Sequence, residues 1–265
     1  MKNLTLGQYY PGDSLLHRLD PRAKLTALFL FYLFLFIISD NLGYAVALFL
    51  GGLILIFSRV PLKVYWRGSR FIILFVVIAA AMNVFFTGGA VVWSYGILEI
   101  TREGIYSAVY MALRLILLLL TAYALTYTTT PMGITDALAS MAAPLQKLKL
   151  PVQDIAMIMA IALRFIPTIM DEAETVKKAQ RGRGVDFSPR RPGIWLQNMV
   201  ALVVPLFVSA FRRSEDLALA MEARGYDGGP DRTMFRELKL NATDIIVMLF
   251  FLALIILTIL YRWFL

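Results

Sequence analysis

Residues 105–127, IYSAVYMALRLILLLLTAYALTY, contain a single charged side chain, that of Arg114. The hydrocarbon core of a membrane is about 30 Å thick, so a helix rising about 1.5 Å per residue needs about 20 residues to cross it. The run is long enough, and Arg114 should then face protein or water, contact a partner or a lipid phosphate, or extend toward the membrane surface. The whole chain is 59% hydrophobic with a mean hydropathy of +0.70, whereas soluble domains are usually about 45–50% apolar. The sequence therefore predicts an all-α integral membrane protein.

Four further stretches are apolar and nearly as long. They are residues 25–39, 42–58, 71–87 and 245–261. We therefore expect about five transmembrane helices. The predicted regions are a cytoplasmic N-terminal segment at 1–24, a four-helix transmembrane region at 25–127, a cytoplasmic module of long helices at 128–241, and a C-terminal transmembrane helix at 242–265.

Lysine and arginine alternate between the two ends of the predicted spans. The segment before the first span carries four, the turn after that span none, the loop after the second span four, and the loop at 88–104 one. In chain order these residues are Lys2, Arg18, Arg22 and Lys24, then Arg59, Lys63, Arg67 and Arg70, then Arg102. Loops rich in Lys and Arg remain in the cytoplasm. We therefore expect a multi-pass protein of the cell (inner or plasma) membrane with a cytoplasmic N-terminus.

Two more apolar runs, at 155–170 and 194–211, are almost long enough to span the membrane. If both crossed, the segment 171–192 would be translocated with six lysines and arginines, against the positive-inside rule. We therefore predict two long helices on the cytoplasmic side, each apolar in its first half and charged in its second, with the apolar halves buried against another surface. A seven-span topology is the alternative.

These two helices form an internal repeat with an offset of 41 residues. Arg183-Gly184-Val185-Asp186 aligns with Arg224-Gly225-Tyr226-Asp227. Cations in the last turn favour the negative end of the helix dipole, and Gly accepts the left-handed cap conformation, so both motifs predict helix ends. An arginine at such an end also has a rigid fork of donors that suits a carboxylate or backbone carbonyls on a partner. Pro167 and Pro205 lie inside the two runs, where each is expected to bend its helix.

Several motifs together resemble one family. They are Tyr10-Pro11-Gly12-Asp13-Ser14, His17-Arg18-Leu19-Asp20-Pro21-Arg22-Ala23-Lys24, Leu163-Arg164-Phe165-Ile166-Pro167 with Glu174 and Ala179-Gln180, and the two Arg-Gly-x-Asp ends. The chain is similar, over nearly its whole length, to the T component of energy-coupling factor (ECF) transporters. The resemblance implies a subunit that bridges two ABC-type ATPases to a small membrane-embedded substrate-binding S component, with short Ala-Arg-Gly motifs on two coupling helices docking into the ATPases.

The resemblance also implies which residues contact the partners. The ATPase-docking residues would be Gly182, Arg183, Gly184, Ala223, Arg224 and Gly225, where Gly182 replaces the family's alanine. Arg181 is a rival for the first docking position, and Asp186 and Asp227 are additional candidates. The platform for the S component would consist of Ile155, Met159, Leu163, Ile166, Val200, Val204 and Phe207.

The sequence argues against other functions. It has no metal-ligand spacing, no Walker-type glycine loop and no nucleophile with a base partner, so we expect a non-catalytic subunit without a cofactor or a metal, with ATP hydrolysis in partner chains. The net charge of +8 is interpreted as membrane orientation and not as nucleic-acid binding. The main alternative to a subunit of an importer for vitamins or other micronutrients is a self-sufficient secondary transporter. The five predicted spans contain no Asp or Glu to couple ions, which weighs against it.

Overall fold

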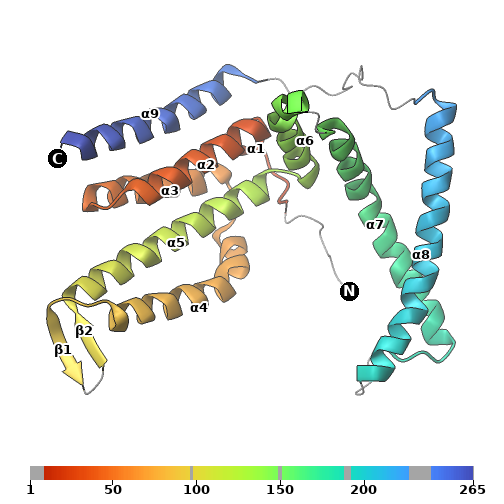
Figure 1. Ribbon diagram of the computed structural model, residues 1–265, viewed down its shortest axis with the longest axis horizontal. Helices are drawn as coiled ribbons and strands as arrows, with labels where there is room; N and C mark the ends of the chain where they lie inside the picture. The colour runs from red at the N-terminus through yellow and green to blue at the C-terminus, as the bar shows by residue number, and fades with distance from the viewer. Residues whose placement is uncertain (1–8, 96–97, 149–150, 188–191, 227–239, 265) are drawn as a thin grey trace. The chain divides into compact units, whose positions relative to one another are not determined.

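The computed structural model describes residues 9–95, 98–148, 151–187, 192–226 and 240–264, and they are almost entirely helical (Figure 1). The helices and strands in chain order are α1 (Leu15–Arg18), α2 (Pro21–Ile37), α3 (Asn41–Ser58), α4 (Leu62–Phe86), β1 (Val91–Tyr95), β2 (Leu98–Thr101), α5 (Arg102–Thr128), α6 (Pro131–Ala142), the 3₁₀ helix η1 (Ala143–Leu148), α7 (Val152–Gly182), α8 (Pro192–Ala223) and α9 (Ala242–Phe264). The predicted all-α class is confirmed, with one small exception described below.

The chain divides into two compact units. The first, which we call the bundle, consists of residues 1–150 together with 238–265, and the second, which we call the crossed pair, consists of residues 151–237. The bundle therefore contains α1 to α6 and also α9 from the far end of the chain, whereas the crossed pair contains α7 and α8.

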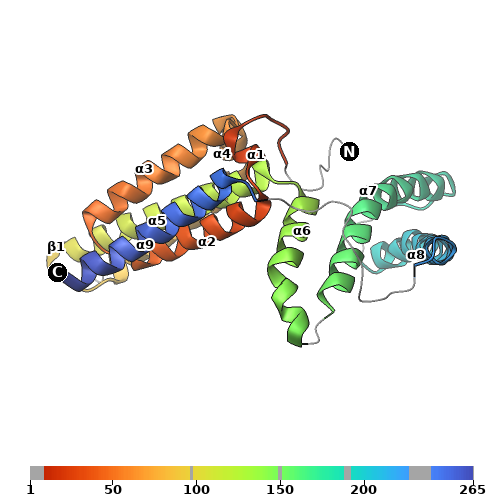
Figure 2. The same cartoon turned by 90° about the horizontal axis from the view of Figure 1, so that it is seen from above.

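The core of the bundle lies among α2, α3, α5 and α9. α2 packs against both α9 and α5, and α5 packs against α3 and α4; Figure 2 shows α9 beside α2 although they are far apart in the sequence. The side chains of Phe31, Leu35 and Ala47 are completely buried. Phe31 from α2 meets Phe251 from α9 edge to face, with ring centroids 6.0 Å apart. These contacts fix the C-terminal helix in the bundle.

Buried polar contacts tie the N-terminal segment to the start of α9. The carboxylate of Asp244 is fully buried and accepts hydrogen bonds from the backbone N–H groups of Asp20 (2.9 Å) and Asn241 (2.8 Å). The buried Lys24 ammonium donates to the carbonyl of Thr128 (3.0 Å) and the hydroxyl of Thr129 (3.2 Å) at the end of α5. A cation suits the negative end of a helix dipole. The beginnings of α2 and α9 and the end of α5 are therefore joined.

Arg114 in α5 faces protein. Its guanidinium donates to the hydroxyl of Tyr44 (2.7 Å) and to the carbonyl of Ile38 (3.3 Å), the residue that ends α2. It also lies over the rings of Phe36 and Tyr44. The sequence left several surroundings open for this cation; the structure gives it a carbonyl, a hydroxyl and two aromatic faces within the bundle.

A hairpin between α4 and α5 departs from the all-helical expectation. Strands β1 and β2 pair antiparallel in the loop predicted at 88–104. Thr101 is the last residue of the hairpin and the N-cap of α5. Its hydroxyl accepts from the N–H of Gly104 (3.0 Å), which caps the helix, and donates to the carbonyl of Thr87 (2.7 Å). Backbone pairing in a loop without a long apolar run was not foreseen, since hydropathy alone does not report it.

Six helices of the described chain are long and apolar enough to cross a membrane by length and composition: α3, α4, α5, α7, α8 and α9. α2, with 17 residues, is one residue shorter than the shortest of these, α3 with 18. The chain is therefore a multi-pass membrane protein, whereas the number of spans and the side on which each end lies remain predictions from charge.

The crossed pair consists of two long helices that each contain an internal proline. α7 runs from Val152 to Gly182 through Pro167, and α8 runs from Pro192 to Ala223 through Pro205. Figure 2 shows that α7 changes direction about half-way along its length, the region of Pro167, as expected where a proline removes a backbone hydrogen bond. Figure 1 shows the two helices crossing each other.

Candidate functional site on the crossed pair

The end of α7 is closed by a Schellman motif. The N–H of Val185 donates to the carbonyl of Gln180 (3.0 Å), and the N–H of Gly184 donates to the carbonyl of Arg181 (3.0 Å). Gly184 has a φ angle of +89°, the left-handed conformation that this motif requires and that glycine adopts without a Cβ penalty. Arg183 is thus the residue at the helix cap, immediately before the turn.

The end of α8 repeats this geometry bond for bond. The N–H of Tyr226 donates to the carbonyl of Met221 (3.0 Å), the N–H of Gly225 donates to that of Glu222 (2.9 Å), and Gly225 has a φ angle of +77°. Each of these residues lies 41 positions after its counterpart in α7. Arg224 consequently occupies the same place in its motif as Arg183 does in its own.

Both cap arginines are exposed. Within the described part of the chain neither guanidinium pairs with a carboxylate, whereas Lys178 pairs with Glu174 and Arg213 with Glu172. An arginine that is exposed and held by a rigid cap is available to a partner. Arg181 is exposed too, but the equivalent position in α8 is Glu222, so the repeat distinguishes Arg183 from its rival.

The remaining predicted docking residues surround these caps. Gly182, Gly184, Ala223 and Gly225 are exposed, and a Cβ built on any of the three glycines would meet no side chain of the described residues within 4 Å. The carbonyl of Asp186 accepts a hydrogen bond from the side chain of Asn198 on α8, which ties the turn after α7 to the neighbouring helix. Asp227 lies outside the described residues.

The two helices are joined where they cross by a cluster around Glu172. Its carboxylate accepts from the Arg213 guanidinium (3.0 Å) and from the hydroxyl of Ser209. The Arg213 guanidinium also lies 5.7 Å from the ring centre of Phe165 on α7. The charged side chains are about one third exposed, at 35% for Arg213 and 26% for Glu172. This contact is therefore better shielded from water than a free surface pair.

The position of this contact follows from the repeat. Arg213 lies 41 residues after Glu172, so equivalent points of the two helices meet at the crossing. Identical charged residues at such a point would repel each other, whereas Glu opposite Arg attract. Each cap arginine lies eleven residues, or about 16 Å of helix, beyond its crossing residue. The two arms that carry the arginines are therefore equal in length.

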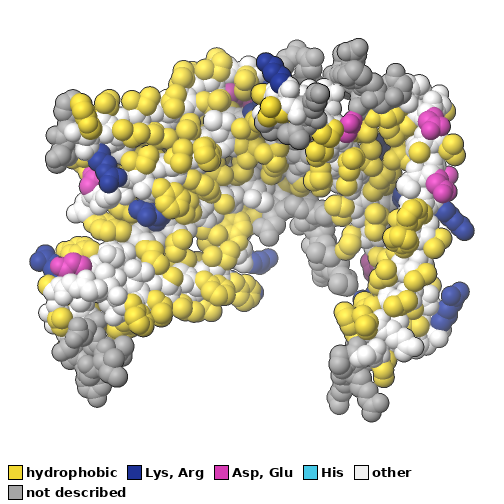
Figure 3. Space-filling view, in the orientation of Figure 1, with side chains coloured by type: hydrophobic (Ala, Val, Ile, Leu, Met, Phe, Trp, Pro, Cys, Tyr) yellow, Lys and Arg dark blue, Asp and Glu magenta, His cyan; other side chains and the backbone are white. Residues whose placement is uncertain are grey.

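The apolar halves of the pair are largely uncovered within the described chain. The predicted platform residues Ile155, Met159, Val200, Val204 and Phe207 are 45–61% exposed, and Leu163 and Ile166 are half-buried. Figure 3 shows hydrophobic side chains over the visible faces of both helices and charged side chains along the right-hand edge. Apolar surface of this extent is typical of contact with a membrane or another protein.

The helical bundle and the crossed pair together define a multi-pass α-helical membrane protein, and its described residues hold no cluster suited to a metal ion. The family described as CbiQ, cobalt transport protein, matches residues 12–235. The chain is 44% identical over 247 residues to the energy-coupling factor transporter transmembrane protein EcfT of Ruminiclostridium cellulolyticum, covering 93% of this chain and 92% of that protein.

Similar matches connect the chain to proteins of the same description in other bacteria. It is 45% identical over 260 residues to the one from Limosilactobacillus fermentum (95% and 97% covered) and 42% over 257 residues to the one from Bacillus subtilis (96% and 97% covered). The chain belongs to the family of energy-coupling factor transporter transmembrane proteins, as the motifs in its sequence predict.

Sequence reasoning missed the crossing contact, although a signal for it was present. The same offset of 41 residues that aligns the two arginine ends also aligns Glu172 with Arg213. Opposite charges at equivalent positions of a repeat indicate a place where the two copies can meet. The repeat therefore limits the crossing to a few places, because Asp171 with Arg212 and Arg181 with Glu222 are also opposite charges at this offset.

Proposed function

We propose that this chain is the energy-coupling transmembrane subunit of an ABC-type ECF importer. It carries out no catalysis itself; it passes the ATP-driven motion of two ATPase subunits to a membrane-embedded S component, which takes up a vitamin or another micronutrient. The observation that carries this proposal is the pair of exposed arginines, Arg183 and Arg224, held by matching caps at equal distances from the crossing.

Each arginine docks into one ATPase. The guanidinium fork forms charge-assisted hydrogen bonds with a carboxylate or with carbonyls that end a helix of the partner. The Schellman cap holds the backbone beside the arginine, so less conformational freedom is lost on docking. Two equivalent tips suit two ATPase subunits of the same kind.

The crossing serves as the pivot. The Glu172 and Arg213 contact holds α7 and α8 together at the crossing, and Asn198 makes a second contact with the carbonyl of Asp186. An approach or separation of the ATPases changes the angle between the helices. The apolar arms, from the crossing back to Val152 and Pro192, are each about 30 Å long, about twice the length of the docking arms. A rotation therefore displaces the apolar ends farther than the tips, although by less than the ratio of lengths in α7, where Pro167 bends the arm.

The S component rests on the apolar arms. Exposed residues such as Ile155, Met159 and Phe207 supply a surface that a membrane protein can cover, and they can slide against it because nonpolar contacts are not directional. The identity of the imported molecule is set by the S component, a separate chain.

The decisive experiment removes the arginines. Arg183→Ala or Arg224→Ala should weaken association with the ATPases by about 2–5 kcal/mol if the docked guanidinium is desolvated, compared with about 0–1 kcal/mol for an exposed pair. The double variant should lose both ATPases and all transport. The measurement is the amount of ATPase that copurifies with the tagged, membrane-inserted chain, identified by mass spectrometry, with uptake assayed alongside.

Two variants serve as matched controls. Arg181→Ala removes an exposed arginine two residues away and should have little effect. Arg→Lys at either tip should restore association only in part, because the ammonium lacks the planar fork. Normal ATPase copurification and uptake in the double variant would show that both arginines are simply helix caps, and the docking proposal would be wrong.

A further inference from the structure

The bundle contains a large cavity that the coupling function does not use. It has a volume of about 690 Å³ and lies among α1, α2, α3, α5 and α9. Ligand cavities in proteins are usually of about 300–1,000 Å³, mostly apolar, with a few polar groups that fix the ligand's orientation. This cavity has that size and composition.

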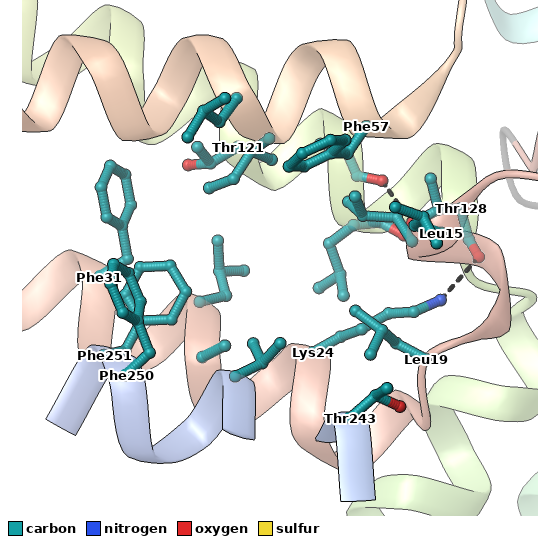
Figure 4. Close-up of a pocket in the computed structure, with 18 of the residues that line it drawn as sticks. Leu15, Leu19, Lys24, Phe31, Phe57, Thr121, Thr128, Thr243, Phe250 and Phe251 are labelled. Carbon is teal, nitrogen blue, oxygen red and sulfur yellow. Dashed lines mark hydrogen bonds between the residues drawn. The ribbon is translucent and has the colours of Figure 1, made fainter. Parts of the chain in front are cut away.

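The lining changes in character from one end to the other. Figure 4 shows Lys24, Thr128 and Thr243 at one end and Phe31 and Phe251 at the other. The polar end also includes Arg18, whereas no acidic side chain of the described chain lines the cavity. Asp20 and Asp244 lie close to Lys24, but they accept hydrogen bonds from backbone N–H groups. The charged side chains that line the cavity itself are thus cationic and lie at one end, and the rest of the lining is mostly apolar.

The two ends lie at different depths along the helices. Lys24 precedes Phe31 by seven residues of α2, and Thr243 precedes Phe251 by eight residues of α9, so the apolar end lies about 10–12 Å further along both helices. The cationic end coincides with the starts of α2 and α9, where the predicted spans begin. A charged headgroup at the membrane surface and an acyl chain reaching inward match this arrangement.

Two observations show that a ligand can enter and be held. The lining residues Leu15, Phe57 and Phe250 are 45–63% exposed, so the cavity is open along part of its wall. An ammonium group has three donors, and among the described residues two of those on Lys24 meet Thr128 and Thr129, which leaves one for a ligand. Arg18 is exposed at the same end.

We propose that this cavity binds one anionic phospholipid, with the phosphate near Arg18 and Lys24 and an acyl chain directed toward Phe31 and Phe251. The bound lipid fills the space among α2, α3 and α9 and supports the bundle from within. This site is independent of the arginine docking, since all of its residues lie in the bundle.

Native mass spectrometry of the purified transporter complex, with added phosphatidylglycerol or phosphatidylcholine of equal acyl chains, tests the proposal. The natural chain should retain one phosphatidylglycerol. Leu53→Trp places a larger side chain into the cavity and should lower retention of the lipid about tenfold. This is the effect expected when about two methylene groups of the acyl chain are no longer buried. Leu48→Trp on the exposed face of the same helix is the matched control and should change nothing.

The charge at the cavity mouth is tested separately. Arg18→Gln should reduce the preference for phosphatidylglycerol over phosphatidylcholine about fivefold, since each basic residue near a membrane surface contributes about that factor. Arg70→Gln, an exposed arginine outside the cavity, should leave the preference unchanged. The proposal would be overturned if the natural chain retained the two lipids equally, or if a free fatty acid or a partner segment occupied the cavity. An equal loss of lipid in Leu48→Trp and Leu53→Trp would also overturn it.

Discussion

The bundle and the crossed pair are built from helices of similar apolar character, but they bury their side chains to very different extents. In the bundle, Phe31 and Leu35 are completely buried, whereas Phe207 and Phe211 in the crossed pair are 61% and 55% exposed. The bundle holds itself together through side-chain packing among four helices. The crossed pair is held by the seam between its two helices and by hydrogen bonds within each helix. The apolar surface of the crossed pair is therefore suited to partners or membrane and not to a core of its own.

The largest expected effect is the loss of stability when a buried phenylalanine of the bundle, and not an exposed one of the crossed pair, is truncated. Phe31→Ala should lower the free energy of unfolding by about 3 kcal/mol, at the low end of the range for buried phenylalanines, because van der Waals packing is what holds membrane helices together. Phe207→Ala in the chain without partners should cost well under 1 kcal/mol. The measurement is denaturation in mixed micelles with increasing sodium dodecyl sulfate, followed by circular dichroism.

Phe207→Ala should matter more in the assembled transporter than in the isolated chain. If the apolar arm carries the S component, Phe207→Ala should clearly reduce the amount of S component that copurifies, although it hardly changes the stability of the isolated chain. Equal losses of stability for Phe31→Ala and Phe207→Ala in the isolated chain would mean that the crossed pair has a core of its own.

The sequence predicted the membrane helices well where the apolar run covers nearly the whole helix. The expected span at 42–58 corresponds to α3 (Asn41–Ser58), and that at 105–127 to α5 (Arg102–Thr128). The span expected from 71 belongs to a helix that begins at Leu62. Lys63, Arg67 and Arg70 make that first part polar, but they are good helix formers, so the helix extends beyond its apolar segment.

Local chemistry also predicted both helix ends, because the Arg-Gly signature is a property of a few adjacent residues. Contacts between distant residues could not be obtained in this way. The hydrogen bond from Asp20 to Asp244 joins positions 224 residues apart, and the hairpin at 91–101 depends on backbone pairing. Neither leaves a periodic pattern in a single sequence.

A reversal of charge at the crossing tests whether the pivot sets the geometry of the pair. Glu172→Arg or Arg213→Glu alone places like charges at the contact and should destabilise it by about 1–2 kcal/mol, and the double reversal should restore most of that loss. Because the chain has no cysteine, spin labels at Ala179→Cys and Ala220→Cys, two exposed and equivalent positions, can report the distance between the arms.

Each single reversal should broaden the distribution of distances between the two labels, and the double reversal should narrow it again. A distribution that is the same in all four proteins would show that Glu172 and Arg213 do not hold the crossing. The helices would then be positioned by apolar contacts or by partners.

The smallest expected effect concerns Gly182 and Gly184, which lie on either side of Arg183 and have different roles. Gly184 has a φ angle of +89°, so Gly184→Ala should destabilise the cap by about 1 kcal/mol and speed amide exchange at Val185 about fivefold. Gly182 ends the helix in open space, so Gly182→Ala should stabilise the last turn by about 0.5 kcal/mol and slow that exchange about twofold. Gly225→Ala in α8 should behave like Gly184→Ala, because its φ angle is +77°. Hydrogen exchange with mass-spectrometric detection measures all three.

Gly182→Ala also restores the Ala-Arg-Gly pattern and should leave ATPase copurification intact, whereas unchanged exchange in Gly184→Ala would mean that the cap does not hold Arg183.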